Sequence, residues 1–447
     1  MSTPAYAEYQ ESGIAWVGKI PVGWSIKPFY SLASERNESN KGMLKDNLLS
    51  LSYGRVVRKD IESNDGLLPE SFETYQIVRA GDIIFRLTDL QNDKRSLRTA
   101  TVQEDGIITS AYLAAVPRAI ESRYLGYLLR SYDTTKVFYS MGGGLRQSMK
   151  FSDIKRLPTL VPPLEEQIAI AAFLDLETVK IDALISEQEK LITLLAEKRQ
   201  ATISRAVTKG LNPNAPMEDS GVEWLGDIPR LWTTARVKQI STFITSGPRG
   251  WSDYIDERGD DIFLQSGDLN YELEILPHQA KRVVPPQGAE GVRTRLDIGD
   301  VVVCITGANT GRVAVVDSLP ATTYINQHLS LIRPIKSKVN PNYLALVLAS
   351  NICQTYFEVR QYGLKEGLSL KNVADAPLPL PDIAEQSAIV SYVREETSKL
   401  MSLDAVARQG IALLKERRSA LLSAAVTGKI DVRQAVPQEQ LPIQEAA

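Results

Sequence analysis

One short phrase occurs twice in this chain, once near its start and once at its midpoint. The sequence ESGIAWVGKIPVGW at residues 11–24 returns as DSGVEWLGDIPRLW at residues 219–232, and seven of the 14 aligned positions are identical. Four of the five tryptophans lie in these two copies, at Trp16, Trp24, Trp224 and Trp232. A phrase repeated after about 200 residues indicates two similar halves, and 447 residues exceed what one hydrophobic core usually serves. The chain is therefore predicted to fold as two related domains.

The repeat extends beyond the tryptophans when the halves are compared at an offset of 219 residues. Three later segments recur in the same order: 123–146 over 342–365, 154–170 over 373–389, and 194–210 over 413–429. Residues 26–115 and 234–325, by contrast, have almost nothing in common. Each half therefore consists of a repeated lead-in, a variable block and a repeated helical segment.

Each repeated helical segment begins after a proline-rich stretch, LPTLVPPLEEQ or APLPLPDIAEQ. Proline keeps the preceding residue out of the helix, and acidic residues suit the first helical turn. Apolar residues then follow at alternating steps of four and three residues, which is the narrow seam of a coiled coil. The predicted seam comprises Ile170, Leu174, Ile181, Leu184, Leu191 and Leu195 in the first segment, and Ile389, Val393, Leu400, Leu403 and Leu414 in the second.

Each segment has about 40 residues and would span roughly 60 Å as one helix. Because the two seams have the same phase, the two helices are predicted to bury them against each other. The alternative is that each is an ordinary amphipathic helix packed on its own domain. Gly410 is a weak point in the second helix.

The variable blocks are predicted to be mixed α/β domains. Short strands are expected within 77–87 and 294–307, where Gly-Asp precedes a β-branched run, and helices are expected at 122–139 and 341–358. The stretch LNPNAPMEDSG, residues 211–221, is rich in turn-forming residues and marks the boundary between the halves.

Composition excludes several classes of protein. No run approaches the roughly 18 apolar residues of a membrane span, and MSTPAYAEYQESG is not a secretory signal. Two cysteines make no disulfide framework, which favours a cytoplasmic location. A net charge of −3 argues against wholesale electrostatic binding to nucleic acid, but it allows a binder with its positive charge on one face.

The motifs of common catalytic sites are also missing from the sequence. ITGANTGRV at 305–313 has the glycines of a phosphate loop but no lysine, and its Asn309-Thr310-Gly311 is predicted to form a turn. GGG at 142–144 is followed by no dinucleotide pattern. Two histidines and two distant cysteines provide no zinc ligand set, and no nucleophile elbow occurs. We therefore expect no catalytic residues, no metal and no cofactor in this chain.

The variable blocks fit DNA binding better. From Ser25 to Arg156 there are 20 Lys and Arg against 16 Asp and Glu. RLTDLQNDKRSLR at 86–98 mixes cations that neutralise phosphates with side chains that address base edges, and the alternative is a solvated polar loop. The candidate DNA-binding residues of this stretch are Arg86, Asp89, Gln91, Asn92, Lys94, Arg95 and Arg98.

From Thr234 to Asp375 in the second half, acidic and basic residues balance at 15 each, so charge favours no partner there. Three short stretches supply polar and aromatic side chains, although for each residue taken alone a structural or merely exposed role is the favoured alternative. The candidates are Arg249 and Trp251 in SGPRGWSDY, Asn309, Thr310 and Arg312 in TGANTGR, and Asn326 and Gln327 in INQH. Arg146 and Lys365, which match each other in the repeat, complete the predicted set.

The repeated SGxxWxGxIPxxW, together with the PLxEQxxI opening and the ExRxxxIxxAVT close of the first helix, resembles the specificity subunit of type I restriction–modification enzymes. The resemblance runs from Glu11 to about Lys429. It implies two α/β (α+β) target-recognition domains, separated by long antiparallel coiled-coil helices in an internal pseudo-two-fold repeat. On this basis residues 1–155 and 213–376 are the two recognition domains. Residues 156–212 and 377–430 are the helical regions conserved between the halves, and 431–447 is a polar tail.

The resemblance also implies a function and partners. Each recognition domain would read one half of a split site in double-stranded DNA, and the helices would dock two methyltransferase (modification) subunits. Adenine methylation with S-adenosylmethionine would belong to those subunits, and ATP-driven translocation and cleavage to restriction subunits. The chain departs from the repeat at Ser-Leu-Asp-Ala (402–405) and at Gly410, which stands where the first half has Leu191, so a kink or looser packing is expected there. The alternatives are a standalone DNA-binding protein and a coiled-coil scaffold.

Overall fold

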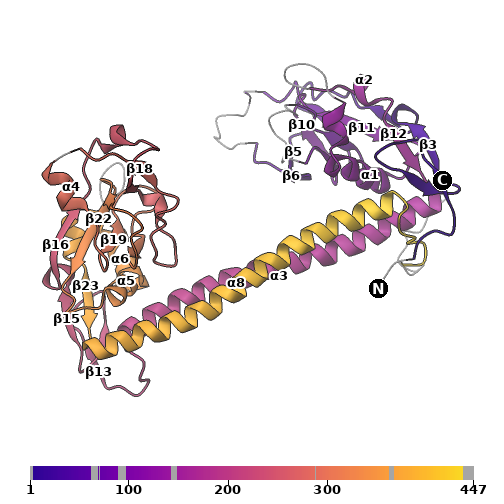
Figure 1. Ribbon diagram of the computed structural model, residues 1–447. Helices are drawn as coiled ribbons and strands as arrows, with labels where there is room; N and C mark the ends of the chain where they lie inside the picture. Colours follow the sequence, from indigo (N-terminus) through magenta and orange to yellow (C-terminus); the bar gives the residue numbers. More distant parts are fainter. Residues whose placement is uncertain are drawn as a thin grey trace. The chain divides into compact units, whose positions relative to one another are not determined.

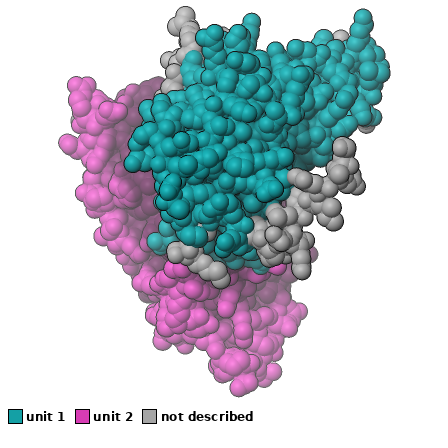
Figure 2. Space-filling view, turned by 90° about the vertical axis from the view of Figure 1, so that its right-hand side faces the viewer, with its two compact units in different colours: residues 1–188, 409–447 teal, residues 189–408 magenta. Residues whose placement is uncertain are grey.

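The computed structural model describes residues 4–61, 69, 71–88, 97–141, 148–286, 288–361 and 367–435. It divides into two compact units, one of residues 1–188 with 409–447 and the other of residues 189–408 (Figure 1 and Figure 2). Each unit therefore contains one variable block and parts of both repeated helical segments. The expectation of two mixed α/β domains joined by two long helices that pack together is confirmed.

The first unit is built on a four-stranded antiparallel sheet. Its strand order is β4 (Ala33–Glu35), β11 (Leu113–Pro117), β8 (Ile83–Phe85) and β9 (Thr99–Thr101). Helix α1 (Ser122–Thr134) covers the sheet with its apolar face, where Leu125 and Leu128 are fully buried. The Glu121 carboxylate caps α1 by accepting the backbone N–H of Tyr124, as an N-cap side chain does.

Smaller elements complete this unit. Three two-stranded pairs join β5 (Leu49–Ser52) with β6 (Arg55–Arg58), β7 (Gln76–Val78) with β10 (Gly106–Ile108), and β1 (Tyr9–Glu11) with β2 (Lys19–Pro21). A fourth pairs β3 (Ser25–Pro28) with β12 (Pro158–Val161), next to the short helix α2 (Phe151–Ile154). The last pair joins the segment after the lead-in phrase to the stretch before the first long helix.

The second unit repeats the four-stranded sheet in the same order. Its strands are β16 (Ser241–Ser246), β22 (Leu329–Pro334), β19 (Val301–Cys304) and β20 (Val313–Val315). A three-stranded sheet of the same unit has the strand order β18 (Lys281–Val283), β17 (Asp261–Leu264) and β21 (Thr323–Ile325). Two further pairs join β13 (Met217–Asp219) with β14 (Asp227–Pro229), and β15 (Thr233–Arg236) with β23 (Pro377–Leu380). They match the pairs β1 with β2 and β3 with β12 of the first unit. Short helices α4 (Ala289–Thr294) and α7 (Leu370–Ala374) complete it.

The helix predicted at 122–139 is shorter than expected, and the one predicted at 341–358 is divided in two. Helix α1 ends at Thr134 and a 3-10 turn follows at Val137–Ser140. The second helix is two helices, α5 (Pro341–Ala349) and α6 (Asn351–Arg360), because Ser350 adopts an extended backbone conformation between them. The helical periodicity continues across this break, so the sequence pattern did not reveal it.

The Gly-Asp signals that predicted strands have a clear structural basis. Gly81 and Gly299 take positive φ values of 92° and 95°, which glycine adopts without strain. The aspartate that follows each glycine is buried and paired with an arginine: Arg36, the residue after β4, pairs with Asp82, and Arg333 of β22 pairs with Asp300. Burial with a charged partner satisfies a carboxylate that would otherwise be costly to remove from water.

Two long helices run through both units: α3 (Leu164–Lys209) and α8 (Ile383–Val426) (Figure 1). In the first unit the beginning of α3 packs with the end of α8, so that Leu174 shares a core with Val426. In the second unit the end of α3 packs with the beginning of α8, so that Val207 shares a core with Val393. The two helices are therefore antiparallel in each unit. Helix α8 continues through Gly410 without interruption.

The predicted seam is correct at seven buried positions, which are Ile170, Leu174, Ile181, Leu195, Ile389, Val393 and Leu400. It is wrong at Leu184, Leu191 and Leu403, which are exposed at 53%, 41% and 53%. In α3 every second seam position lies one residue later than predicted, at the buried Thr178 and the half-buried Ile185 and Ile192. A straight α-helix of 3.6 residues per turn drifts relative to a strict heptad, which accounts for this change.

Residues repeated between the halves make equivalent contacts in the two units. The Tyr124 hydroxyl donates towards the carbonyls of Leu160 and Val426, at 3.2 and 3.4 Å. The Tyr343 hydroxyl does the same towards Pro379 and Val207, at 2.9 and 3.4 Å. All these positions are related by 219 residues. Each tyrosine therefore joins its own unit to the end of the long helix that begins in the other half of the sequence.

Gln167 and Gln386, the glutamines that follow the repeated prolines, make the same hydrogen bonds in their two units. The Gln167 amide donates to the Pro162 carbonyl at 2.8 Å, and its oxygen accepts the Glu121 N–H at 2.9 Å. Gln386 makes the matching bonds to Pro381 and Asn340, both at 2.8 Å. Each glutamine thus ties the first turn of a long helix to the N-terminus of the helix that covers the sheet.

The second tryptophan of each repeated phrase packs against the end of a long helix. Trp24 is buried in the core that contains the end of α8, and Trp232 in the core that contains the end of α3. A Cβ added to Gly428 would lie 3.2 Å from the Trp24 ring, and one added to Gly210 would lie 3.1 Å from the Trp232 ring. The Trp232 indole N–H also donates to the Glu385 carboxylate at 2.9 Å.

We expect Gly428→Ala to destabilise the chain by about 2–3 kcal/mol, since alanine is strained in the left-handed region and overpacking adds to the cost. Gly428 has a φ of 72°, and an added Cβ would lie 2.3 Å from Pro21 Cδ. Gly410→Ala is the control, because its added Cβ meets no described atom within 4 Å and alanine favours the helix. Urea unfolding of both variants tests this, and equal midpoints would contradict it.

Candidate nucleic-acid interface

Two of the stretches predicted to bind DNA, one from each half, lie between equivalent strands of their units. Residues 86–98 connect β8 to β9, and residues 305–312 connect β19 to β20. These strand pairs hold the same two positions in their four-stranded sheets. The loops have unrelated sequences and different lengths, so sequence comparison did not reveal that they are equivalent.

The loop of the second unit is a well-defined turn. The Thr310 N–H donates to the Gly307 carbonyl and the Arg312 N–H to the Asn309 carbonyl, both at 3.0 Å, which confirms the turn predicted at Asn309-Thr310-Gly311. Gly307 and Gly311 take positive φ values of 92° and 88°. The turn presents the candidate side chains of this loop from one compact segment.

Side chains fasten this loop to the adjacent segment 266–271. The Asn309 amide donates to the Ser266 carbonyl and the Arg312 guanidinium to the Leu269 carbonyl, both at 3.0 Å. The guanidinium of Arg312 also lies over the Tyr271 ring, 4.3 Å from its centre. Stacking of this kind holds a guanidinium in one plane.

The segment 325–328 joins the same cluster of loops. The Ile305 N–H donates to the His328 carbonyl at 2.9 Å, and the Thr306 hydroxyl lies 2.5 Å from His328 Nδ1. Gln327 contacts the other ring nitrogen of His328 at 3.3 Å. The structure thus brings Asn309, Thr310, Arg312 and Gln327 together with the exposed His328, which belongs to the same predicted stretch INQH as Gln327.

Asn326 and Trp251 are buried, while Arg249 is exposed. The side chain of Asn326 accepts the His328 N–H at 3.0 Å and so shapes the turn. Trp251 is 3% exposed and packs on Tyr324 and Phe263, with ring centres 5.3 and 6.0 Å away. In this conformation the indole therefore serves the core of the unit and presents no face on which a base could stack.

In the first unit Arg98 lies at the base of the candidate loop. Its side chain is fully buried and donates to the Thr88 carbonyl at 3.0 Å and to the Tyr139 hydroxyl at 3.3 Å. Its backbone N–H donates to Asp133, whose pKa is raised by burial. A contact between this guanidinium and DNA would require it to leave these partners. Arg86 is half-buried, and its N–H pairs with the Arg98 carbonyl at 2.8 Å.

The other candidate residues lie outside the described part of the chain, and their DNA contacts stay predictions. They are Asp89, Gln91, Asn92, Lys94, Arg95, Arg146 and Lys365.

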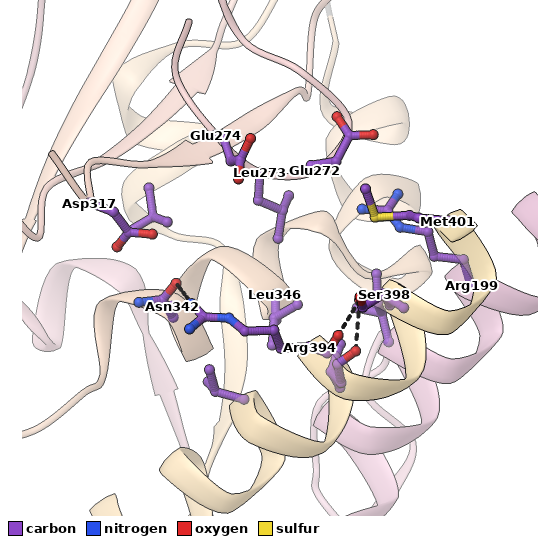
Figure 3. Close-up of a pocket in the computed structure, with 15 residues that line it drawn as sticks. Arg199, Glu272, Leu273, Glu274, Asp317, Asn342, Leu346, Arg394, Ser398 and Met401 are labelled. Atoms are coloured by element: carbon purple, nitrogen blue, oxygen red, sulfur yellow. Dashed lines mark hydrogen bonds between the residues drawn. The ribbon is translucent and has the colours of Figure 1, made fainter. Parts of the chain in front are cut away.

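Two hollows border the turn at 270–274 in the second unit. One of about 310 Å³ is lined by the candidate loop from Asn309 to Arg312, together with Gln354. The other, of about 410 Å³, is lined by charges of both signs, and Figure 3 shows Arg394 reaching Asn342 beside it, at 3.4 Å.

Among the described residues no group of three or more His, Cys, Asp or Glu side chains is placed to hold a metal ion. No helix of that part of the chain is long and apolar enough to cross a membrane.

Comparison with known proteins identifies the family. The family model for the type I restriction modification DNA specificity domain matches residues 229–401. A protein of Methanocaldococcus jannaschii named for the MjaX type I restriction enzyme specificity subunit is 21% identical over 436 residues, covering 93% of this chain and 96% of that one. The type I restriction enzyme EcoBI specificity subunit of Escherichia coli is 25% identical over 282 residues, covering 60% and 58%.

The chain belongs to the type I restriction–modification specificity subunits. Its fold is similar to that of the HsdS subunit of Thermoanaerobacter tengcongensis, with a TM-score of 0.50 and 18% identity over 92% of this chain and 98% of that one. A chain solved in a study of complex assembly and conformational transition of the type I R-M system matches with a TM-score of 0.69 and 17% identity, covering 92% and 99%. This specificity subunit is therefore the DNA-specificity component of its system, and catalysis belongs to other components.

Sequence reasoning missed one residue of the specificity subunit that the loop cluster contains. Tyr271, which lies under the Arg312 guanidinium, belongs to the segment NYELEIL, which carries no motif. Only its position next to the candidate loop in the folded chain draws attention to it.

We expect Arg98→Met to destabilise the specificity subunit by about 2–3 kcal/mol, because it removes the hydrogen bonds that a fully buried guanidinium donates to the half-buried Thr88 and Tyr139. Arg249→Met is the matched control, and as an exposed substitution it is expected to change stability by less than about 0.5 kcal/mol. Thermal unfolding of the two variants measures the difference. Equal stabilities would show that the Arg98 contacts contribute nothing net.

Proposed function

We propose that this specificity subunit binds a bipartite site in double-stranded DNA, with each variable block reading one half-site. The proposal rests on one observation above all. Equivalent loops with unrelated sequences, 86–98 and 305–312, stand at the same place on two sheets of the same strand order. A fixed frame with two different loops is the arrangement that a split, asymmetric target requires. The recognition domains would be residues 1–155 and 213–376.

The candidate side chains are of the types that contact DNA. Arginine addresses guanine O6 and N7, and asparagine and glutamine address adenine N6 and N7. Arg312, Asn309 and Gln327 come from neighbouring segments of the second unit, and Arg249 is exposed there. Phosphate contacts from cations of this kind would set affinity and orientation, while base contacts would set sequence preference.

We further propose that two methyltransferase subunits dock on the long helices, and that restriction subunits join the same complex. Support comes from leucines and valines that the helix pair does not bury. The first unit exposes Leu184 and Leu413, and the second exposes Leu191, Leu194, Leu403 and Val406. Exposed apolar side chains on a helix surface mark a binding site for a partner. Leu184 matches Leu403 and Leu194 matches Leu413 in the repeat, which provides two similar surfaces for two copies of one subunit.

The cytoplasm is the proposed location. Both cysteines, Cys304 and Cys353, are free and buried, and free thiols are typical of a reducing compartment.

Exchange of residues 26–155 for the matching block of another specificity subunit is expected to change one half-site and leave the other intact. A map of methylated adenines in cells that express the chimera with its partner subunits measures both half-sites. The reciprocal exchange of residues 234–375 should change only the other half-site. A standalone DNA-binding protein would leave no methylation pattern to change, and a pure scaffold would show the original pattern after either exchange.

Arg249→Ala is expected to weaken DNA binding at physiological salt and to reduce the slope of log K against log salt by about 1, as the loss of one phosphate contact does. Arg230→Ala, which removes a cation paired with Glu218 at 3.5 Å, is the control and should leave the slope unchanged. Fluorescence anisotropy with a labelled duplex at several salt concentrations measures both. Identical slopes for Arg249→Ala and the parent chain would exclude Arg249 from the interface.

A further inference from the structure

Tyr271 lies between the long helix α3 and the candidate recognition loop of the second unit. Its backbone carbonyl accepts a hydrogen bond from the guanidinium of Arg199, a residue of α3. Its ring lies under the guanidinium of Arg312, with 4.3 Å from that carbon to the ring centre. Arg312 is the last residue of the loop before β20. One tyrosine thus contacts the helical frame through its backbone and the loop through its ring.

The turn that carries Tyr271 has a fixed shape. The Asn270 side-chain oxygen accepts the N–H groups of Glu272 and Glu274, at 3.0 and 2.8 Å. Leu273 takes a positive φ of 66°, and its carbonyl accepts the Val315 N–H at 2.8 Å. Since β20 contains Val315, the turn is attached to the strand that leaves the loop.

Side-chain packing around this turn is sparse. Hollows of about 410 and 310 Å³ border the turn, and Arg199 and Leu273 line both; Figure 3 shows these two residues at the first hollow. Tyr271 itself is 70% exposed. A solvent-exposed tyrosine contributes little to a hydrophobic core, so burial does not account for its position under Arg312.

We propose that Tyr271 is a positioning residue that holds the Arg312 guanidinium ready to contact a guanine in the second half-site. A free arginine side chain loses about 2 kcal/mol of rotamer entropy when it is ordered. Stacking on Tyr271 and the hydrogen bond to Leu269 order the guanidinium before DNA arrives, so less of this cost falls on binding. A planar guanidinium held in this way suits the paired acceptors O6 and N7 of guanine. The inference rests on the proposed DNA reading by this unit.

The test compares Tyr271→Ala, Tyr271→Phe and Arg312→Met in complexes with the methyltransferase subunits. Methylation rates are measured on duplexes that carry the target or a single base-pair change in either half-site. Tyr271→Phe keeps the ring and is expected to match the parent chain within about twofold, whereas Tyr271→Ala should lose about three- to tenfold of discrimination at one base pair of the second half-site. Arg312→Met should lose discrimination at the same base pair. Tyr30→Ala, which removes an exposed ring from the first unit, is the control.

The outcomes separate this inference from the proposed function. The positioning role is supported if Tyr271→Ala and Arg312→Met lose discrimination at the same base pair. The first half-site must be unaffected and the thermal unfolding midpoint retained. If only Arg312→Met loses discrimination, the role of Tyr271 is overturned, while the proposal that the loop reads DNA still stands. An equal loss of rate on all duplexes overturns it too, because a phosphate contact or a general structural defect would act on every sequence alike. If block exchange also leaves the second half-site unchanged, the proposed function itself fails.

Discussion

The contact between the end of each long helix and the domain it enters is the one on which the rest of this structure depends. The carbonyl of Val426 at the end of α8 is reached by Tyr124, and that of Val207 at the end of α3 by Tyr343. The last carbonyls of a helix have no partner within the helix, so a buried helix end needs donors from elsewhere. Here the donor is a buried phenol of the sheet-covering helix, and Trp24 or Trp232 closes the same site beside a glycine with a positive φ.

These contacts explain why the chain repeats some phrases and varies others. A residue such as Gln167 or Gln386 has hydrogen bonds to two fixed backbone groups, so few other side chains fit its position. The loops 86–98 and 305–312 begin and end on strands that the sheet already holds, so their sequences and lengths are free to differ. A specificity subunit needs this separation, because new DNA targets require new loops on an unchanged frame.

The coiled-coil seam shows where sequence periodicity reaches its limit. Ile170, Leu174, Ile389 and Val393 were predicted correctly because each is also buried by a domain core. Between the cores the helix pair alone decides which side chains are covered, and the neighbouring apolar residues Leu184 and Ile185, or Leu191 and Ile192, allow two registers. The exposed Leu184 and Leu403 became recognisable as partner surface only once the register of the fold was known.

The sequence by itself determined the two-fold plan of this protein, its mixed α/β class, its long helices and its family. These follow from repeated residues whose spacing is the same in both halves, and spacing is visible without a structure. Only the tertiary structure decided that Arg98, Trp251 and Asn326 are buried, that the loops 86–98 and 305–312 are equivalent, and that Tyr271 lies under Arg312. An arginine, a tryptophan or an asparagine has the same chemistry on a surface as in a core, so its role depends on which distant segments fold against it.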